Sequence, residues 1–336
     1  ARLSLTAIPL AWAQAFAKPM AIESGELSMV LAVEAEPDGS RVRARAVEPL
    51  AVRTVTVRDA SKKLLVDRVT LTVKPNVDYS AARVIAKLSE LTVTMPDGDT
   101  VGAELAADVT NLSTTPVVAF TAQLQAKIVN ALKPYLNVPT GPLAITANLE
   151  GRLEGQTLQL AKLSSTVNRD GNVLLAALDL QQPVRADLKA STFAVPNPTA
   201  TALRLRLGEI PLAWAEPFVA QSKLSGQLGG GTLEVALRTV EDVTLTTAEP
   251  LTLRGVTAVI EGKTLAQTLD LDANLTATKR GETVTYDLRR IEVKQGQTAL
   301  AALNVAGEAK LGAKLSATAK GNLDADVAAL MQQPML

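Results

Sequence analysis

The stretch Arg41-Val42-Arg43-Ala44-Arg45-Ala46 decides the fold class, because basic and small apolar residues alternate along it. Successive side chains of a β-strand point to opposite faces of a sheet, so this pattern predicts a strand with one hydrated and one apolar face. The same alternation runs through most of the chain, between turn sequences such as Pro37-Asp38-Gly39. We therefore expect an all-β dominated fold of repeated antiparallel meanders that form a curled, U-shaped, groove-like sheet with a few short helices.

The apolar positions of the alternating stretches are candidate lining residues of an apolar groove. A sheet face of this kind must be covered by another layer or by a ligand, because exposed apolar area is unfavourable in water. The candidate groove residues are Leu27, Met29, Leu31, Val33, Val42, Ala44, Val55, Val57, Val69, Leu71, Val73, Leu203, Leu205, Leu207, Leu269, Leu271 and Leu275.

A long internal repeat organises the chain. The segment Ile8–Phe16 (IPLAWAQAF) recurs as Ile210–Phe218 (IPLAWAEPF), and the two segments contain both tryptophans of the chain. The match continues at a nearly constant offset, with Ser24-Gly25 corresponding to Ser225-Gly226. We expect a first β-groove repeat over residues 1–201 and a second, truncated copy over 202–336; two separate globular domains are the alternative.

Three segments depart from the period of two and predict short helices: residues 10–20, 122–136 and 322–332. In the second, Leu124, Ile128 and Leu132 have helical spacing, and Pro134 would end the helix. The first repeat is therefore expected to contain a helix near 122–136. Asn322 or Asp324 would be the N-cap of the third helix.

The composition indicates a thin, aliphatic core and excludes several kinds of function. Hydrophobic residues make up 47% of the chain but aromatic residues only 3%. Lysine plus arginine and aspartate plus glutamate are both 34, so no nucleic-acid partner is expected. Cysteine and histidine are absent, which removes thiolate nucleophiles, the commonest metal ligand and the commonest general base. We expect no enzymatic activity, no metal and no cofactor.

Four motifs could carry chemistry, and each is better explained by structure alone. Asp97-Gly98-Asp99 resembles part of a calcium loop but lacks its other ligands, so a turn is expected. Asp270 and Asp272 are expected to be solvated acids of one strand face rather than a glycosidase pair. Gly229–Gly231 predicts a bend or bulge between strands and not a phosphate loop, because no Lys-Ser/Thr follows it. Trp12 and Trp214 are expected to pack at the repeat junctions.

The paired IPLAWA segments, the Ser-Gly-x-Leu strand starts at Ser24 and Ser225, and the Leu-x-Ala-x-(Val/Ile) lead-ins to short helices resemble the AsmA-like family. This resemblance implies a periplasmic protein, anchored in the inner membrane of a bacterial envelope and built of β-groove units whose apolar interior lets phospholipid move between membranes. It implies no catalytic residues. No apolar run reaches the ~18 residues of a membrane span. The chain begins at Ala1 in a strand pattern, so we expect a piece of a longer protein whose other segments reach the membrane.

The leading functional hypothesis is therefore non-enzymatic binding or conduction of phospholipid, with other envelope proteins as possible partners. The alternative is a structural or adhesive surface protein of tandem β-sandwich domains. It predicts two compact units joined by a linker near 195–202, whereas the groove hypothesis predicts a sheet that continues through this stretch. A polysaccharide-acting enzyme that uses only carboxylates is a third, weaker alternative.

Overall fold

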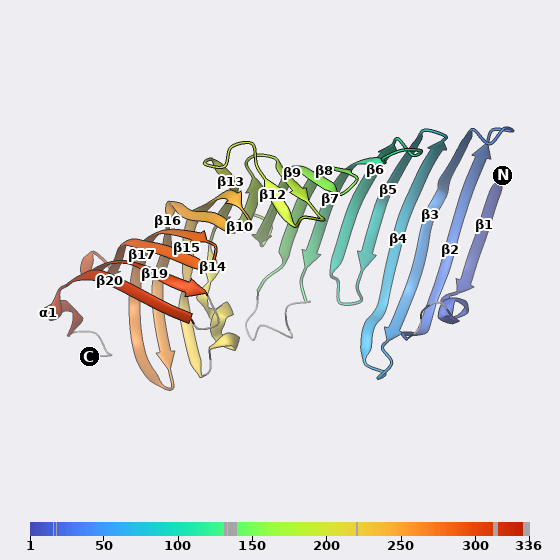
Figure 1. Cartoon of the computed structure of the whole chain (residues 1–336). Helices are drawn as coiled ribbons and strands as arrows, with labels where there is room; N and C mark the ends of the chain where they lie inside the picture. The colour runs from blue at the N-terminus through green and yellow to red at the C-terminus, as the bar shows by residue number, and fades with distance from the viewer. Residues whose placement is uncertain are drawn as a thin grey trace. The chain divides into compact units, whose positions relative to one another are not determined.

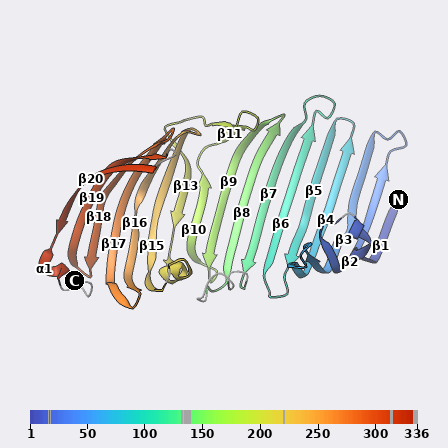
Figure 2. The same cartoon turned by 60° about the horizontal axis from the view of Figure 1, so that its bottom comes forward.

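A computed structural model describes residues 1–15, 17, 19–130, 133, 140–219, 221–311 and 315–331. The fold expected from the sequence is confirmed in its main features, because a 20-stranded antiparallel sheet contains all the strands and helices are few and short (Figures 1 and 2). Among the described residues, no helix has both the length and the apolar character needed to cross a membrane. The chain divides into two compact units, which are described separately.

The first unit comprises Ala1–Ala131 and Pro142–Ala161 and is a simple meander. Each strand pairs antiparallel with the next one in the chain, from β1 to β8. Its elements are β1 (Arg2–Pro9), η1 (Leu10–Ala15), β2 (Ala21–Ala35), β3 (Arg41–Arg58), β4 (Leu64–Ser80), β5 (Arg83–Thr94), β6 (Thr100–Thr110), β7 (Val117–Ile128) and β8 (Leu143–Glu154), followed by the start of β9 (Thr157–Arg169).

The second unit comprises Leu132–Gly141 and Lys162–Leu336. It contains the rest of β9 and a second meander, whose strands β15–β17 curve along their length in Figure 1. Its other elements are β10 (Val173–Leu180), β11 (Val184–Asp187), β12 (Thr192–Ala194), β13 (Thr201–Leu207), β14 (Ile210–Pro211), η2 (Leu212–Phe218), β15 (Ser222–Thr239), β16 (Asp242–Ile260), β17 (Lys263–Arg280), β18 (Thr283–Gln295), β19 (Thr298–Leu311), β20 (Leu315–Ala325) and α1 (Val327–Leu330).

The sequence repeat corresponds to a structural repeat. In each copy, a strand leads into a 3-10 helix formed by the IPLAWA segment, and a meander of long strands follows. One side-chain hydrogen bond recurs at the same place. Ile22 N donates to Gln14 Oε1 at 2.7 Å, and Leu224 N donates to Glu216 Oε1 at 2.7 Å. The Gln/Glu position of the repeated motif thus fastens the helix to the strand that follows it.

The irregularities of the strands recur as well. Strands β3, β4 and β5 of the first meander each contain a residue with positive φ, and β16, β17 and β18 of the second meander contain one at the matching position. Each lies next to a break in the pairing register. The matching pairs are Thr54 and Gly255, Arg68 and Thr268, and Glu90 and Arg290. Gly230 and Gly231 also flank register breaks inside β15, so a bulge is present there, but within one strand and not between strands as expected. Such β-bulges bend a strand and increase its local twist.

The helix expected near residues 122–136 is wrong for its first part. Residues 122–128 belong to β7 and pair with β6 and β8 along their length. Ala122, Leu124, Ala126 and Ile128 fit a period of two as well as a helix, and pairing on both sides decides between these readings. Residues 131, 132 and 134–136 of this prediction lie outside the described residues.

The other two expected helices are shorter than the sequence suggested. The segment 10–20 contains η1 over Leu10–Ala15 only. Asn322 and Asp324 lie inside β20, so neither is an N-cap. Asp326 caps α1 instead, since Ala329 N donates to its Oδ1 at 3.0 Å.

The stretch near 195–202 is not a linker between sheets. Residues 181–200 contain the small β11–β12 hairpin, which belongs to the same sheet through the pairing of β11 with β9, while β10 pairs directly with β13. The side chain of Gln182 connects the two ends of this segment. Its amide donates to Asn197 O at 2.8 Å, and Asn197 N donates to its Oε1 at 2.9 Å. Within the second unit the sheet therefore continues past this point.

Candidate functional site

One face of the first unit is apolar across its strands. Directly paired residues of an antiparallel sheet point to the same face. The register connects Ala44 with Val77, Val77 with Ala86, Ala86 with Ala107, and Ala107 with Phe120. We call the face that carries this row the apolar face of the first unit, and the opposite side its polar face.

The groove residues predicted in the first unit all lie on this apolar face. Leu31 and Val33 pair with Ala46 and Ala44, and Val55, Val52 and Leu50 pair with Val69, Leu71 and Val73. The predicted residues Leu27, Met29, Leu31, Val33, Val42, Ala44, Val55, Val57, Val69, Leu71 and Val73 are each half-buried. Their side chains thus remain partly open to solvent.

The apolar face also extends over β5–β8, where no residue was singled out from the sequence. The period-two alternation of apolar residues in this region predicts the face, but the helix predicted over 122–136 conflicted with the alternation in β7. The additional residues on this face are Val84, Ala86, Leu88, Leu91, Val93, Val101, Ala103, Leu105, Ala107, Val109, Val118, Phe120, Ala122, Leu124, Ala126, Ile128, Leu143, Ile145, Ala147, Leu149 and Leu153. None of them carries a charge.

The one phenylalanine among the residues named for this face lies over the backbone of the neighbouring strand. Phe120 pairs with Gly151 across β7 and β8. A Cβ on Gly151 would be 2.6 Å from Phe120 Cζ, so the ring occupies the space above the glycine. The aromatic ring of Phe120 therefore covers the backbone of Gly151 on the neighbouring strand.

The second unit has an apolar face of its own. Leu205 pairs with Leu178 on one side and with Leu233 on the other, and Leu271 pairs with both Leu253 and Val293. The pairings across β15 and β16 place both groups on the same face. The predicted groove residues Leu203, Leu205, Leu207, Leu269, Leu271 and Leu275 all lie there, and each is half-buried.

Among the residues that the structure describes, no second sheet of the same unit packs on either apolar face. The extensive contacts among the described elements of the first unit join neighbouring strands, or β2 and η1. A sandwich core would bury such side chains almost completely. In the first unit, Ala46 and Leu143 are the buried hydrophobic residues among those named for the face. The tandem β-sandwich architecture is therefore not observed in the described part of either unit.

The polar face of the first unit carries ion pairs between adjacent strands. Asp78 of β4 accepts from Arg41 at 2.5 Å and from Arg43 at 3.2 Å, and Arg45 lies 3.6 Å from Glu34. The hydrogen bond from Arg41, with a further one from Arg43, lowers the pKa of Asp78 to about 2. Arg41, Arg43 and Arg45 thus alternate with the apolar residues of β3 as the sequence indicated.

These ion pairs predict a specific acid sensitivity. The pKa of Asp78 is lower in the folded protein than its ordinary value of 3.8, so its stabilising contribution is complete above that value and is lost as pH falls towards about 2. Asp78→Asn removes this contribution. We expect the urea midpoint of the wild type to exceed that of the variant at neutral pH, and the difference to shrink between pH 4 and pH 2, because the Asp78 carboxylate titrates there in the wild type and is absent from the variant. A difference that stays constant with pH would contradict the assignment.

The other acidic motifs are structural. Asp272 is paired with Arg254 at 2.6 Å, and Asp270 accepts from Gly255 N at 2.8 Å. Asp99 is fully buried beside its turn and accepts from Val129 N at 2.5 Å and Asn130 N at 2.9 Å. Among the described residues, no group of three or more acidic side chains could hold a metal ion.

The two tryptophans have different environments. Trp214 of η2 is half-buried, but Trp12 of η1 is 73% exposed. The expectation that both pack at repeat junctions is wrong for Trp12, since little of the chain covers it. In both copies the motif forms a 3-10 helix, and the Gln or Glu side chain that follows the tryptophan accepts a hydrogen bond from the next strand.

Comparison with known proteins adds no relative: no family model, no curated protein and no solved structure matches this chain.

Proposed function

We propose that this chain is a non-enzymatic lipid-binding segment whose apolar sheet faces carry the acyl chains of phospholipid. The observation that supports the proposal most strongly is the apolar face of the first unit. It continues from β2 to β8, carries no charged residue among those named for β5–β8, and has no second sheet of its own unit packed on it.

The chemistry of the face favours an acyl chain over a folded protein partner. Protein interfaces derive much of their affinity from aromatic anchors and arginine in fitted pockets. Here the side chains are mainly Val, Leu and Ala, and Phe120 lies flat against Gly151. An acyl chain gains about 0.8 kcal/mol for each buried CH2 group and needs no directional bond.

The regularity of the face also suits movement of a bound chain. Each strand presents a similar series of aliphatic side chains at every second position, so neighbouring positions offer similar binding free energies. A lipid tail that moves from strand to strand would exchange one aliphatic contact for another without breaking a hydrogen bond. Conduction along the sheet is therefore part of the proposal. The resemblance to the AsmA-like family suggests the bacterial periplasm as its location, with attachment to the membrane by segments outside this chain.

Lipid analysis of the purified protein tests this function. We expect native mass spectrometry of protein prepared without detergent to detect bound phospholipid, and solvent extraction to recover it. The complementary outcome is a lipid-free protein that forms a dimer through its apolar faces. That result would overturn the proposal, because a second copy would then be the occupant of the face.

A further inference from the structure

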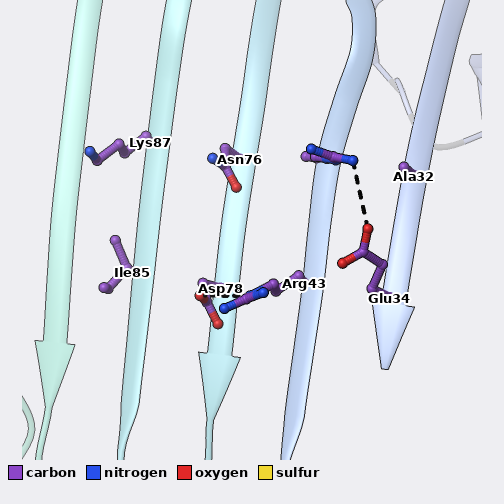
Figure 3. Close-up of a pocket in the computed structure, with 8 residues that line it drawn as sticks. Ala32, Glu34, Arg43, Asn76, Asp78, Ile85 and Lys87 are labelled. Carbon is purple, nitrogen blue, oxygen red and sulfur yellow. Dashed lines mark hydrogen bonds and ion pairs between the residues drawn. The ribbon is translucent and has the colours of Figure 1, made fainter. Parts of the chain in front are cut away.

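A row of small, amide and cationic residues crosses the polar face of the first unit. The register pairs Ala32 with Arg45, Arg45 with Asn76, Asn76 with Lys87, and Lys87 with Ala106. All but Ala106 also line an open cleft of about 330 Å3. Figure 3 shows Asn76 and Lys87 side by side on adjacent strands, with Ala32 at the other end of the view. We call Arg45, Asn76 and Lys87 the cationic row.

Among the described residues, two of the three cations that line the cleft are ion-paired, Arg43 with Asp78 and Arg45 with Glu34, and the third is Lys87. Asp78 is held by both Arg41 and Arg43, so its charge is already shared between two guanidinium groups. Two carboxylates line the same cleft: Glu34, at 3.6 Å from Arg45, and Asp78, which is held by Arg41 and Arg43. Lys87 has no ion pair within 4.0 Å among the described residues. The cleft thus carries three cations, Arg43, Arg45 and Lys87, against two carboxylates, and keeps an excess of one positive charge.

The second repeat indicates that the fold does not require these charges. Matching hairpin ends, Arg41–Ser80 and Asp242–Arg280, align the two meanders residue by residue. The positions of the cationic row are then occupied by Thr246, Thr276 and Asp287, which are paired with one another in the same way. The apolar faces are alike in the two copies, but this part of the polar face differs. The same fold forms in the second repeat with threonine and aspartate at these positions, so the role of Arg45 and Lys87 is not to form the sheet.

We propose that Arg45, Asn76 and Lys87 bind an oxyanion of the phosphate class. The three residues offer donors only towards such a ligand: a guanidinium fork, an amide NH2 and an ammonium group. In Figure 3 the Lys87 side chain extends away from Asn76, and Arg45 lies 3.6 Å from Glu34, so both flexible side chains have to rotate to reach a ligand above Asn76. Ala32 and Ala106 at the ends of the row leave room for the ligand. The site lies on the face opposite the apolar residues, so it is independent of the proposed lipid function.

The test replaces the row by the residues of the second repeat. In Arg45→Thr/Lys87→Asp, each position receives the side chain that the same fold already carries at Thr246 and Asp287. Arg53→Thr/Lys127→Asp is the matched control, since it makes the same charge change on the polar face outside the row. The reciprocal variant Thr246→Arg/Asp287→Lys builds the row in the second repeat. Far-ultraviolet circular dichroism verifies that each variant is folded.

Two probes distinguish the source of the anion. Calorimetric titration with inorganic phosphate measures binding of a free oxyanion. Flotation with vesicles of phosphatidylcholine, with or without phosphatidylglycerol, measures binding of a lipid headgroup. We expect at least one probe to bind the wild type, with affinity at least about tenfold weaker in Arg45→Thr/Lys87→Asp and nearly unchanged in the control. The reciprocal variant should gain a second site of the same kind.

Each outcome decides the matter. Binding of phosphate identifies a site for a soluble anion, and binding of phosphatidylglycerol vesicles alone identifies a headgroup site. The proposal is overturned if neither probe binds the wild type, or if the control loses as much affinity as Arg45→Thr/Lys87→Asp. Since none of these variants alters the apolar face, their results leave the lipid extraction experiment unaffected.

Discussion

The variant Ala103→Asp/Ala107→Asp is expected to lose most of the phospholipid that copurifies with the wild-type protein. Both alanines lie on the apolar face of β6 and are half-buried. A carboxylate beside an acyl chain would have to lose its hydration, and a charged side chain in a hydrocarbon environment costs ~2.5–3.5 kcal/mol. Such a cost corresponds to a decrease in affinity of about 100-fold. Quantitative mass spectrometry of extracted lipid per mole of protein is the measurement.

The matched control for this prediction uses alanines on the other face, one on β6 and one on β8. Ala106 and Ala144 lie on the polar face, where each is paired with a lysine, Lys87 and Lys127 respectively. The variant Ala106→Asp/Ala144→Asp therefore adds the same two charges in a hydrated, cationic setting and should retain its lipid. Equal lipid content in the two variants would show that the apolar face is not where lipid binds.

The second large effect is on stability and concerns the glycine of the repeated Ser-Gly-x-Leu motif. Gly226 has φ of 98°, and a Cβ at this position would be 2.6 Å from Arg254 O and 2.7 Å from Gly255 O. These contacts are with backbone of the neighbouring strand, which cannot move without breaking the pairing of β15 and β16. We expect Gly226→Ala to lower the free energy of unfolding by about 3 kcal/mol, through strain and steric overlap together.

Two other glycines provide a graded control. Gly25, the counterpart in the first repeat, has φ of 139°, and its added Cβ would meet the side chain of Leu10 at 2.7 Å. A side chain can rotate away, so Gly25→Ala should cost less than Gly226→Ala. Gly281 lies in a turn with φ of 55° and no atom within 4 Å of the added Cβ, so about 1 kcal/mol is expected. Urea midpoints that are equal for the three variants would contradict this order.

Much of the fold could be predicted from alternation alone, because successive side chains of a strand point to opposite faces and so apolar and polar residues alternate in the sequence. Arg43 and Ala44 were assigned to opposite faces, and the register of β3 against β4 confirms it. The prediction failed where residue types were ambiguous. In 122–128, alanine and leucine are compatible with both helix and strand, and pairing with β6 and β8 overrides the weak local preference.

The candidate sites were predictable to different degrees. The groove residues predicted from the sequence all fall on apolar faces, because face assignment within a strand is a local property. The cationic row could not be found in this way, since Arg45, Asn76 and Lys87 come from three strands and only the register places them together. The alternation of arginine and alanine in β3 predicts that the arginines share one face, but it does not predict which residues of the neighbouring strands lie beside each arginine.

The amino-acid sequence by itself determined the strands, the repeat of about 200 residues and the division of side chains into an apolar and a polar set, because these depend on patterns a few residues long or on copies of the same pattern. Only the tertiary structure decided the register, the placement of the bulges and the absence of a second sheet over the apolar face within either described unit. These depend on pairings between residues far apart in the chain, such as Val55 with Val69 and Leu205 with Leu233. The free energy of such a pairing depends on its neighbours on both sides, which a linear pattern does not contain.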